Sequence, residues 1–373
     1  MTKKADFLVN AIFLPFILIL ALANALSPDE AISELENRSL QQLPVFSWER
    51  VQSGAFMKDF ETYMTDQFIG KPWWVGLKSD VQRLVLGQRE NNGIYFGDND
   101  FLLEAFLDEG RHFDRNLELL NAFGERLPNL PVTIMLVPTA VKVFEHYLPP
   151  FAPVLDQSLL IERAKSMLRL PFLDVYGTLS EHTQDYIYFR TDHHWTMRGA
   201  YLAYLELMQA WGMEPYTDYQ LQTVSDNFFG TYFAQANNFR IPPDSIEVFV
   251  PNRELQLTLQ RSGDDTPREG IFASEFLQKR DQYSFFLGGV DGLMVIRGNA
   301  GTGKKLLVIK DSYAHNFVPF LTQHFDEIHL IDLRFYNQPL YPYIESTGFD
   351  QALFLYNLSS FGGDPSLIRI EGG

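Results

Sequence analysis

Four short apolar runs constrain the fold more than any other feature of the sequence. They are "VTIMLVP" at residues 132–138, "KLLVIKD" at 305–311, "EIHLID" at 327–332 and "ALFLYN" at 352–357. Such runs are typical of strands that are buried on both faces, as in parallel sheets. Helical patterns occur between them, near residues 114–127, 159–169 and 314–324. The alternation of strands and helices predicts an α/β fold with a parallel sheet.

Two other segments differ from this alternation. Residues 219–300 carry short alternating runs such as "SIEVFVP", separated by Asn, Gly and Asp, which is typical of β-structure. We expect a β-rich insertion there, inside a domain at residues 48–373 that follows a polar linker at 27–47. The chain has 373 residues, of which 46% are hydrophobic, so it has enough apolar side chains for a large core.

The N-terminus carries an apolar segment at residues 7–26, preceded by two lysines. The segment is long enough to cross a bilayer of ~30 Å, and the lysines favour a cytoplasmic position for residues 1–6. The sequence therefore predicts a single-pass transmembrane helix at the cell membrane, with the rest of the chain outside the cytoplasm. A cleaved signal peptide and a secreted protein are the alternative, because "ANA" at 23–25 fits a cleavage site.

Charge and cysteine content exclude several classes of protein. The formal charge is −17, from 30 Lys and Arg against 47 Asp and Glu, so no nucleic-acid partner is expected. The chain has no cysteine, and therefore neither a thiolate nucleophile nor a thiolate metal site. "GNAGTGKK" at 298–305 resembles a phosphate-binding loop, but a strand follows it instead of the helix that such a loop needs. We expect a structural turn there, and no cofactor.

The segment "RTDHHWTMRGAY" at residues 190–201 concentrates ionisable side chains before an expected helix. In an extended segment Asp192 and His194 lie on one side and His193 points away, because side chains alternate. Asp192 can then orient His194 as a base. One alternative is a metal site with both histidines, but further ligands at a recognisable spacing are missing, so no metal is expected. Another is a set of polar residues that cap the helix.

A nucleophile for this base stands in "LLVIKDSYAHNF" at residues 306–317. Ser312 follows a buried strand and precedes a helix, so we expect it at the carboxyl edge of the sheet, where open α/β folds place their sites. Its backbone N–H can bind an oxyanion there. Serine needs a base at neutral pH, and His194 with Asp192 supplies one.

Together these segments resemble the bacterial DHHW protein family, relatives of the SGNH-like alginate O-acetylation proteins. The similar motifs are "TDHHWTMRGAY", "KDSYAHNFVPFLTQHFDEIHLIDLRFYN", "ENRSL", "FETYMTDQFIGK" and "NGIYFG". The resemblance implies a flavodoxin-like, SGNH-type parallel sheet with helices on both faces. It also implies that Ser312 is the nucleophile, His194 the base and Asp192 the orienting acid. Lys310 departs from the Gly-Asp-Ser block of SGNH proteins, and we expect its larger side chain to alter the approach to the oxyanion.

Two further side chains are candidates for binding the substrate. Arg334, in "IDLRFYN", is expected either to bind a substrate hydroxyl or acyl oxygen or to form a surface salt bridge. Asn357 ends the strand "ALFLYN", and is expected either to donate its amide to the oxyanion or to form a turn.

The sequence thus predicts an extracytoplasmic, membrane-anchored SGNH-like O-acetyltransferase that acts on a polysaccharide through an acyl-serine. A carbohydrate acetyl esterase would use the same residues with water as the acceptor. A non-catalytic glycan-binding or assembly protein with the same fold is the alternative outside enzymes. The resemblance implies one further partner, a membrane-bound O-acyltransferase that supplies acyl groups.

Overall fold

The computed structural model describes residues 3–33 and 38–372. The chain divides into two compact units, Met1–Gln88 with Asn237–Phe239, and Arg89–Ala236 with Arg240–Gly373. Residues 1 and 2 of the expected cytoplasmic N-terminus lie outside the described residues. So do residues 34–37, which include the first two residues of the motif "ENRSL".

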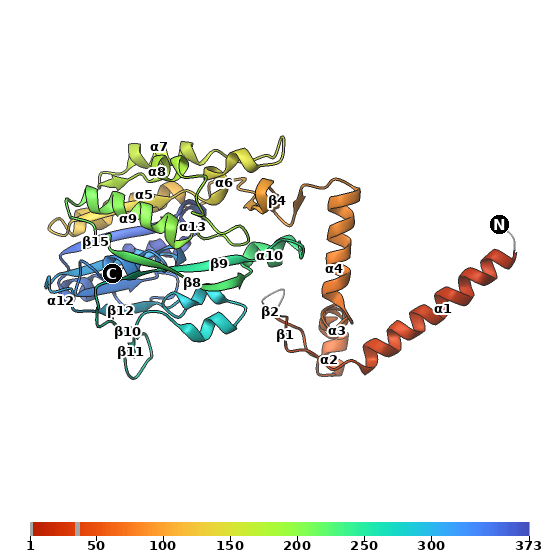
Figure 1. Ribbon diagram of the computed structural model, residues 1–373. Helices are drawn as coiled ribbons and strands as arrows, with labels where there is room; N and C mark the ends of the chain where they lie inside the picture. The colour runs from red at the N-terminus through yellow and green to blue at the C-terminus, as the bar shows by residue number, and fades with distance from the viewer. Residues whose placement is uncertain (1–2, 34–37, 373) are drawn as a thin grey trace. The chain divides into compact units, whose positions relative to one another are not determined.

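The first unit is mainly helical (Figure 1). Its elements are α1 (Lys3–Leu26), β1 (Ile32–Ser33), β2 (Arg38–Ser39), α2 (Trp48–Gln52), α3 (Ala55–Asp66), α4 (Lys71–Asp80) and the π-helical η1 (Val81–Val85). Asn10, Pro15 and Asn24 interrupt the apolar sequence of α1. None of the helices within the described residues combines the length and apolarity needed to cross a bilayer. The predicted transmembrane helix at residues 7–26 is therefore not supported.

The second unit is built on an eight-stranded sheet with the order β11-β10-β12-β14-β13-β15-β6-β7. The neighbours from β14 to β7 pair in parallel, whereas β12, β10 and β11 extend one edge with antiparallel pairs. The strands are β6 (Val132–Val137), β7 (Phe172–Leu173), β10 (Thr258–Arg261), β11 (Arg268–Glu269), β12 (Leu293–Arg297), β13 (Lys305–Lys310), β14 (Glu327–Ile331) and β15 (Gln351–Asn357). The prediction of an α/β fold with a mostly parallel central sheet is confirmed.

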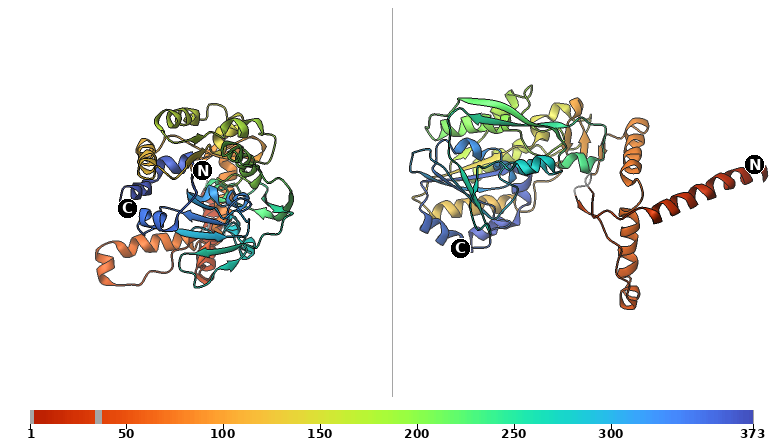
Figure 2. Two further views of the ribbon diagram at one scale, coloured as in Figure 1. Left: turned by 90° about the vertical axis from the view of Figure 1, so that its left-hand side faces the viewer. Right: turned by 60° about the horizontal axis from the view of Figure 1, so that its bottom comes forward.

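Helices cover both faces of this sheet, as Figure 2 shows. Phe123 packs edge-on against Phe354 of β15, with ring centroids 4.9 Å apart. Trp211 instead donates its ring N–H to Thr133 of β6, at 2.9 Å. Phe354 pairs with Ile134, the residue after Thr133, and consecutive strand residues point to opposite faces. The helices are α5 (Phe113–Arg126), α6 (Ala140–Val143), α7 (Gln157–Met167), α8 (Tyr176–Glu181), α9 (Met197–Ala210), α10 (Thr231–Ala236), α11 (Val318–Leu321), α12 (Leu340–Thr347) and α13 (Leu358–Gly363).

The remaining strands form two smaller sheets in the second unit. One contains β3 (Glu90–Asn91), β4 (Ile94–Phe96) and β5 (Leu102–Glu104), and the other contains β8 (Tyr219–Phe228) and β9 (Asp244–Pro251). The glycine-rich segment at residues 298–305 leads from β12 directly into β13, so no helix follows it. This strand–turn–strand arrangement is the one that the sequence predicts.

The helix expected at residues 314–324 is shorter than the sequence pattern suggests. A 3-10 turn, η6 (Ser312–Ala314), follows β13, and α11 begins only at Val318. Pro319 stands in the first turn of α11, where its missing N–H needs no partner. A proline there favours a fresh helix start over one continuous helix.

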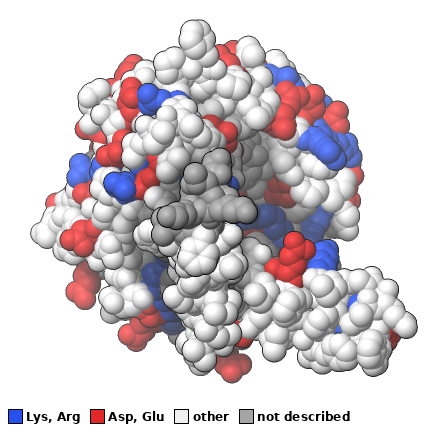
Figure 3. Space-filling model, turned by 90° about the vertical axis from the view of Figure 1, so that its right-hand side faces the viewer, with Lys and Arg blue, Asp and Glu red and all other residues white. Residues whose placement is uncertain are grey.

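Charges of both signs are spread over the surface. On the face in Figure 3, Lys and Arg side chains lie in small groups near Asp and Glu side chains. Two of the exposed ion pairs join Arg115 to Glu118 at 2.9 Å and Arg163 to Glu109 at 2.9 Å. Exposed pairs of this kind each stabilise a fold by only about 0–1 kcal/mol. Burial of apolar side chains in the cores therefore contributes more to the stability of the fold than these surface ion pairs do.

Candidate active site

Asp192, His194 and Ser312 form a chain of hydrogen bonds at the carboxyl edge of the sheet. Ser312 begins η6 directly after β13 and Asp311. Nε2 of His194 lies 2.7 Å from Oγ of Ser312, and Nδ1 of His194 lies 2.5 Å from Oδ1 of Asp192. An ionised carboxylate only accepts hydrogen bonds, so Nδ1 carries the proton and Nε2 accepts from the hydroxyl of Ser312.

The carboxylate of Asp192 is buried and held by backbone groups. Oδ1 also accepts from the backbone N–H of His194 at 3.0 Å, and Oδ2 accepts from the N–H of Thr231, the first residue of α10, at 2.8 Å. Burial raises the pKa of Asp192, but the electrostatic interactions with the imidazoles of His193 and His194 and these hydrogen bonds outweigh it and lower the pKa below its usual range. An ionised Asp192 therefore faces the imidazole.

The imidazole of His194 is buried and uncharged at neutral pH. Its ring stacks on that of Tyr283, with centroids 3.6 Å apart and an interplanar angle of 9°. Burial, and then the nearby charge of His193, lower the pKa of His194 to about 4, while Asp192 acts in the opposite direction. A neutral ring whose Nε2 faces Ser312 can take the hydroxyl proton.

The loop that carries Asp192 and His194 is fixed at both ends. The carboxylate of Asp244, the first residue of β9, accepts hydrogen bonds from the backbone of Arg190 and Thr191 and from the hydroxyls of Thr191 and Tyr186. At the other end Thr196 is the N-cap of α9, and its hydroxyl oxygen accepts from the first turn of that helix. The loop therefore keeps its shape without help from a ligand.

The backbone around Ser312 is also fixed. The hydroxyl of Tyr283 donates to the carbonyl oxygen of Ser312 at 3.0 Å, and Oδ1 of Asp311 accepts from the N–H of Tyr313 at 2.9 Å. Within the described part of the chain, the N–H of Ser312 has no acceptor. This N–H is therefore available to an oxyanion that forms at the serine.

Asn357 lies at the same sheet edge, at the end of β15. Its Nδ2 donates to Oδ2 of Asp311 at 2.8 Å and to Oγ of Ser360 at 2.7 Å, and its Oδ1 accepts from the N–H of Ser360 at 2.8 Å. Both hydrogens of the amide are thus in use, and Asn357 caps α13. Its predicted role as an oxyanion donor stays a prediction that requires one of these bonds to break.

Arg334 follows β14 and forms a two-pronged ion pair with Asp332. The distances are 2.9 Å from Nε to Oδ1 and 2.7 Å from Nη2 to Oδ2. With Asp311, Arg334 lines an open cavity of about 630 Å³. Nη1 of Arg334 has no acceptor among the described residues. The ion pair that the sequence suggested is present, and donors remain for a substrate.

Lys310 directly precedes Asp311 and Ser312, and its side chain is fully buried. Nζ lies 2.6 Å from Nε2 of His315 and 3.6 Å from Oδ2 of Asp332. Burial lowers the pKa of Lys310 to about 8, against the effect of Asp332. Lys310 thus supports the carboxylate that holds Arg334, and its bulk lies in the interior.

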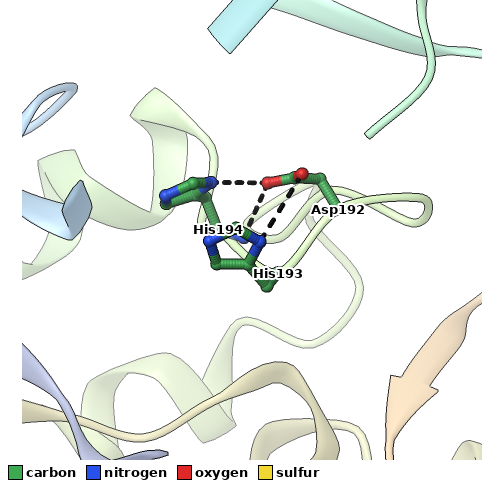
Figure 4. A group of neighbouring side chains, drawn as sticks. All are labelled: Asp192, His193 and His194. Atoms are coloured by element: carbon green, nitrogen blue, oxygen red, sulfur yellow. Dashed lines mark hydrogen bonds and ion pairs between the residues drawn. The ribbon is translucent and has the colours of Figure 1, made fainter. Parts of the chain in front are cut away.

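The prediction that His193 points away from Asp192 is wrong. Residues 191–194 form bends and not a strand, so Nδ1 of His193 lies 3.7 Å from Oδ2 of Asp192 (Figure 4). One ligand atom from each of Asp192, His193 and His194 fits within 4.8 Å. However, both ring nitrogens of His194 already face Asp192 and Ser312. The arrangement thus favours proton transfer over metal binding.

Sequence reasoning missed three residues that position the site. Tyr283, Thr231 and Asp244 all come from the segment expected as a β-rich insertion. No motif marks Tyr283 or Thr231, because their contacts with the site form only on folding. Asp244 likewise carries no local signal, because its partners lie more than fifty residues earlier in the sequence.

Comparisons with known proteins agree with this picture. Residues 159–331, which include Asp192, His194 and Ser312, match the model of the DHHW protein family. The crystal structure of a DHHW family protein from Eubacterium siraeum is similar, with 26% identity and a TM-score of 0.66, over 76% of this chain and 96% of that chain. The predicted resemblance to the DHHW family is confirmed. A comparison with curated protein sequences finds no match.

Two structures of Bacillus cereus PatB1 share the fold. The identity is 22% with a TM-score of 0.61 for one, and 21% with a TM-score of 0.60 for the other, which carries a sulfonyl adduct. Each comparison covers 74% of this chain and 98% of the PatB1 chain. The central sheet and the helices around it are therefore an arrangement that solved structures also contain.

Proposed function

We propose that the protein is an extracytoplasmic SGNH-type O-acetyltransferase that acts on a polysaccharide through an acetyl-serine at Ser312. The observation that carries this proposal is the continuous chain of hydrogen bonds from Asp192 through His194 to Ser312. The match to the DHHW family supports it. The extracytoplasmic location and a membrane-bound O-acyltransferase as donor partner belong to the same proposal.

In the first half of the reaction, Oγ of Ser312 attacks the acyl carbon of a donor ester while Nε2 of His194 takes the hydroxyl proton. The oxyanion accepts from the N–H of Ser312, and Arg334 offers further donors beside it. Asp192 stabilises the imidazolium that forms. His194 then returns the proton to the leaving oxygen, which departs as an alcohol and leaves acetyl-serine.

In the second half, a sugar hydroxyl replaces the donor. Its oxygen attacks the acetyl carbon while its proton moves to Nε2 of His194. The bond from the acetyl carbon to Oγ of Ser312 then breaks, and Oγ regains a proton from His194. If water takes the place of the sugar hydroxyl, the same steps hydrolyse the acetyl-serine.

The test mixes the full-length protein with p-nitrophenyl acetate and a panel of polysaccharides. We expect one equivalent of p-nitrophenol in a rapid burst, followed by O-acetylated glycan. Because one PatB1 structure carries a sulfonyl adduct, a sulfonyl fluoride is the matching probe, and pre-treatment with it should remove the burst. Release of acetate without transfer to any glycan would make the protein an acetyl esterase. Glycan binding without a burst would overturn the enzymatic proposal.

The pH dependence of kcat/KM should report the buried His194. Since its pKa is lowered to about 4, the base stays active until the pH falls to about 4, whereas an ordinary histidine loses activity near about 6.5. Replacing His193 by Gln removes a nearby charge and should shift the acid limb to higher pH. Circular dichroism at each pH separates protonation of His194 from unfolding. An acid limb near pH 6.5 in the parent protein would contradict the prediction that the buried His194 has a lowered pKa.

The stability of the fold should follow the same titration. Between about pH 6.5 and 4 the unfolded chain binds a proton at His194 that the folded chain does not bind. The contribution of His194 to the free energy of unfolding is therefore complete above about pH 6.5 and falls as the pH drops towards 4.

Gly230 should be needed for turnover although it contacts no substrate. A Cβ added there would stand 2.1 Å from Cβ and 2.4 Å from Oδ2 of Asp192, far inside contact distance. Gly230→Ala is expected to displace the carboxylate and to lower kcat/KM by about 10²-fold or more. Gly177→Ala is the matched control, because nothing lies within 4 Å of its added Cβ. Unchanged kinetics in the Gly230 variant would show that Asp192 does not need its present position.

A further inference from the structure

A second cavity, of about 220 Å³, shares lining residues with the 630 Å³ cavity. Tyr313 lines the smaller cavity and Asp311 lines the larger one, so Ser312 stands between residues that face different cavities. Ser359 and Ser360 line both. The two cavities therefore adjoin at Ser359 and Ser360, and each is lined by one chain neighbour of Ser312, so a donor and an acceptor could bind in turn near one nucleophile.

Glu104, the last residue of β5, places a carboxylate in the smaller cavity. Its Oε2 accepts from the hydroxyl of Tyr232 at 2.9 Å, and its Oε1 accepts from the hydroxyl of Ser359 at 2.6 Å. Burial and then Glu104 raise the pKa of Tyr232, which keeps that donor protonated. A carboxylate has about four acceptor sites, so each oxygen of Glu104 keeps one for a ligand hydroxyl.

The other groups around this cavity also suit a sugar. The ring of His193 lies at its edge, with 34% of the side chain exposed and its centroid 6.0 Å from that of Tyr232. Gln235 and the serine hydroxyls add amide and hydroxyl groups. The volume is below the ~300–1,000 Å³ of sites for drug-sized ligands, which suits a single ring.

The two cavities differ in the charged side chains that line them. Among the described residues, no Lys or Arg lines the smaller cavity, and Glu104 is its carboxylate. Arg334 and Arg369 both line the larger one. An anionic sugar in the smaller cavity would face Glu104 without a Lys or Arg side chain to compensate it, and like charges that are partly desolvated repel strongly.

We infer that the smaller cavity is the acceptor site, and that Glu104 binds hydroxyls of an uncharged sugar ring there and disfavours a uronate. This inference rests on the proposed function and names the acceptor for it. The ring presents one further hydroxyl to the acetyl carbon on Ser312, in the transfer step described above. Glu104 is a binding residue in this scheme and takes no part in the proton transfer.

The experiment first acetylates the full-length protein with p-nitrophenyl acetate, and then adds methyl glycosides of glucose, galactose, mannose and N-acetylglucosamine, each beside its uronate where one exists. The acceptor concentration for half-maximal deacylation and the burst amplitude are measured separately. We expect neutral glycosides to speed deacylation and uronates to have little effect. Glu104→Ala should raise the half-maximal concentration by about tenfold or more.

Two further variants make the result specific. Glu104→Gln keeps one acceptor oxygen, replaces the other by an amide donor that a hydroxyl oxygen can accept, and is uncharged, so it should discriminate less against uronates. Glu118→Gln is the control, because Glu118 is exposed and pairs with Arg115. Uronates that outperform neutral glycosides in the parent, or Glu104 variants that match the parent, would overturn the inference.

Binding to the Ser312→Ala variant separates the two proposals. If neutral glycosides bind to this variant in a Glu104-dependent way, while the parent shows no burst, the acceptor site is supported and acetyl transfer is rejected. If the parent shows the burst, but the effect of glycosides on deacylation does not depend on Glu104, acetyl transfer is supported and the acceptor site is rejected.

Discussion

The variant Ser312→Ala is expected to lose the burst of p-nitrophenol completely and to lower kcat by about 10⁴–10⁶-fold. The substitution removes only the Oγ that lies 2.7 Å from Nε2 of His194, and no other atom of residue 312 can form the acyl bond. The residual rate should not exceed what binding and the oxyanion donors alone provide. Stopped-flow absorbance measures the burst, and steady-state release measures kcat.

Ser346→Ala is the matched control for this prediction. Ser346 is exposed and its hydroxyl donates to the carbonyl of Tyr343, so its removal should leave both burst and turnover unchanged. A Ser312→Ala protein that keeps the burst would assign acylation to another residue. Equal thermal unfolding of both variants and the parent would show that the loss is chemical.

The variant Asp192→Asn should lower kcat/KM by about 10⁴-fold while Ser312 and His194 stay in place. An asparagine amide turned towards Nδ1 donates a hydrogen bond, which favours the imidazole with its proton on Nε2. That tautomer cannot accept the proton of Ser312. The backbone N–H of Thr231, now 2.8 Å from Oδ2, can still bond to an amide oxygen, so the loop should fold.

Asp185→Asn, at an exposed position of the same loop region, is the control and should keep parent kinetics. Rate measurements over pH 5–9 distinguish a wrong tautomer from a misplaced ring. If Asp192→Asn retained most of the activity, His194 would not need a carboxylate to orient it.

The sheet could be predicted well because its signal is local. The runs at 132–138, 305–311, 327–332 and 352–357 are strands with bounds within a residue of those expected, since a buried strand must be apolar throughout. The bounds of the helix expected at 314–324 could not be predicted from periodicity alone, because Pro319 sets a new helix start. The N-terminal segment forms a helix, but no crossing helix is found among the described residues.

The site was predictable where two residues share a short segment. Asp192 and His194 were paired by assuming an extended chain, and they do meet, but through a bend that Asp244 holds and that also turns His193 towards Asp192. The role of Tyr283 could not be foreseen, because its ring reaches His194 only through the packing of a distant segment. The position of Glu104 could likewise not be predicted from the sequence, since its hydrogen bonds with Tyr232 and Ser359 form only on folding.

In the proposed mechanism, Ser312 carries the acetyl group between donor and acceptor. The most direct measurement quenches the full-length protein with acid during the burst and locates the acetyl group by peptide mass spectrometry. The proposed mechanism predicts acetylation on Ser312 in the parent, none at that position in Ser312→Ala, and loss of the adduct when a competent glycan is added before the quench. An unacetylated Ser312 during a measurable burst, or an acetyl group on a different residue that passes to the glycan, would contradict it.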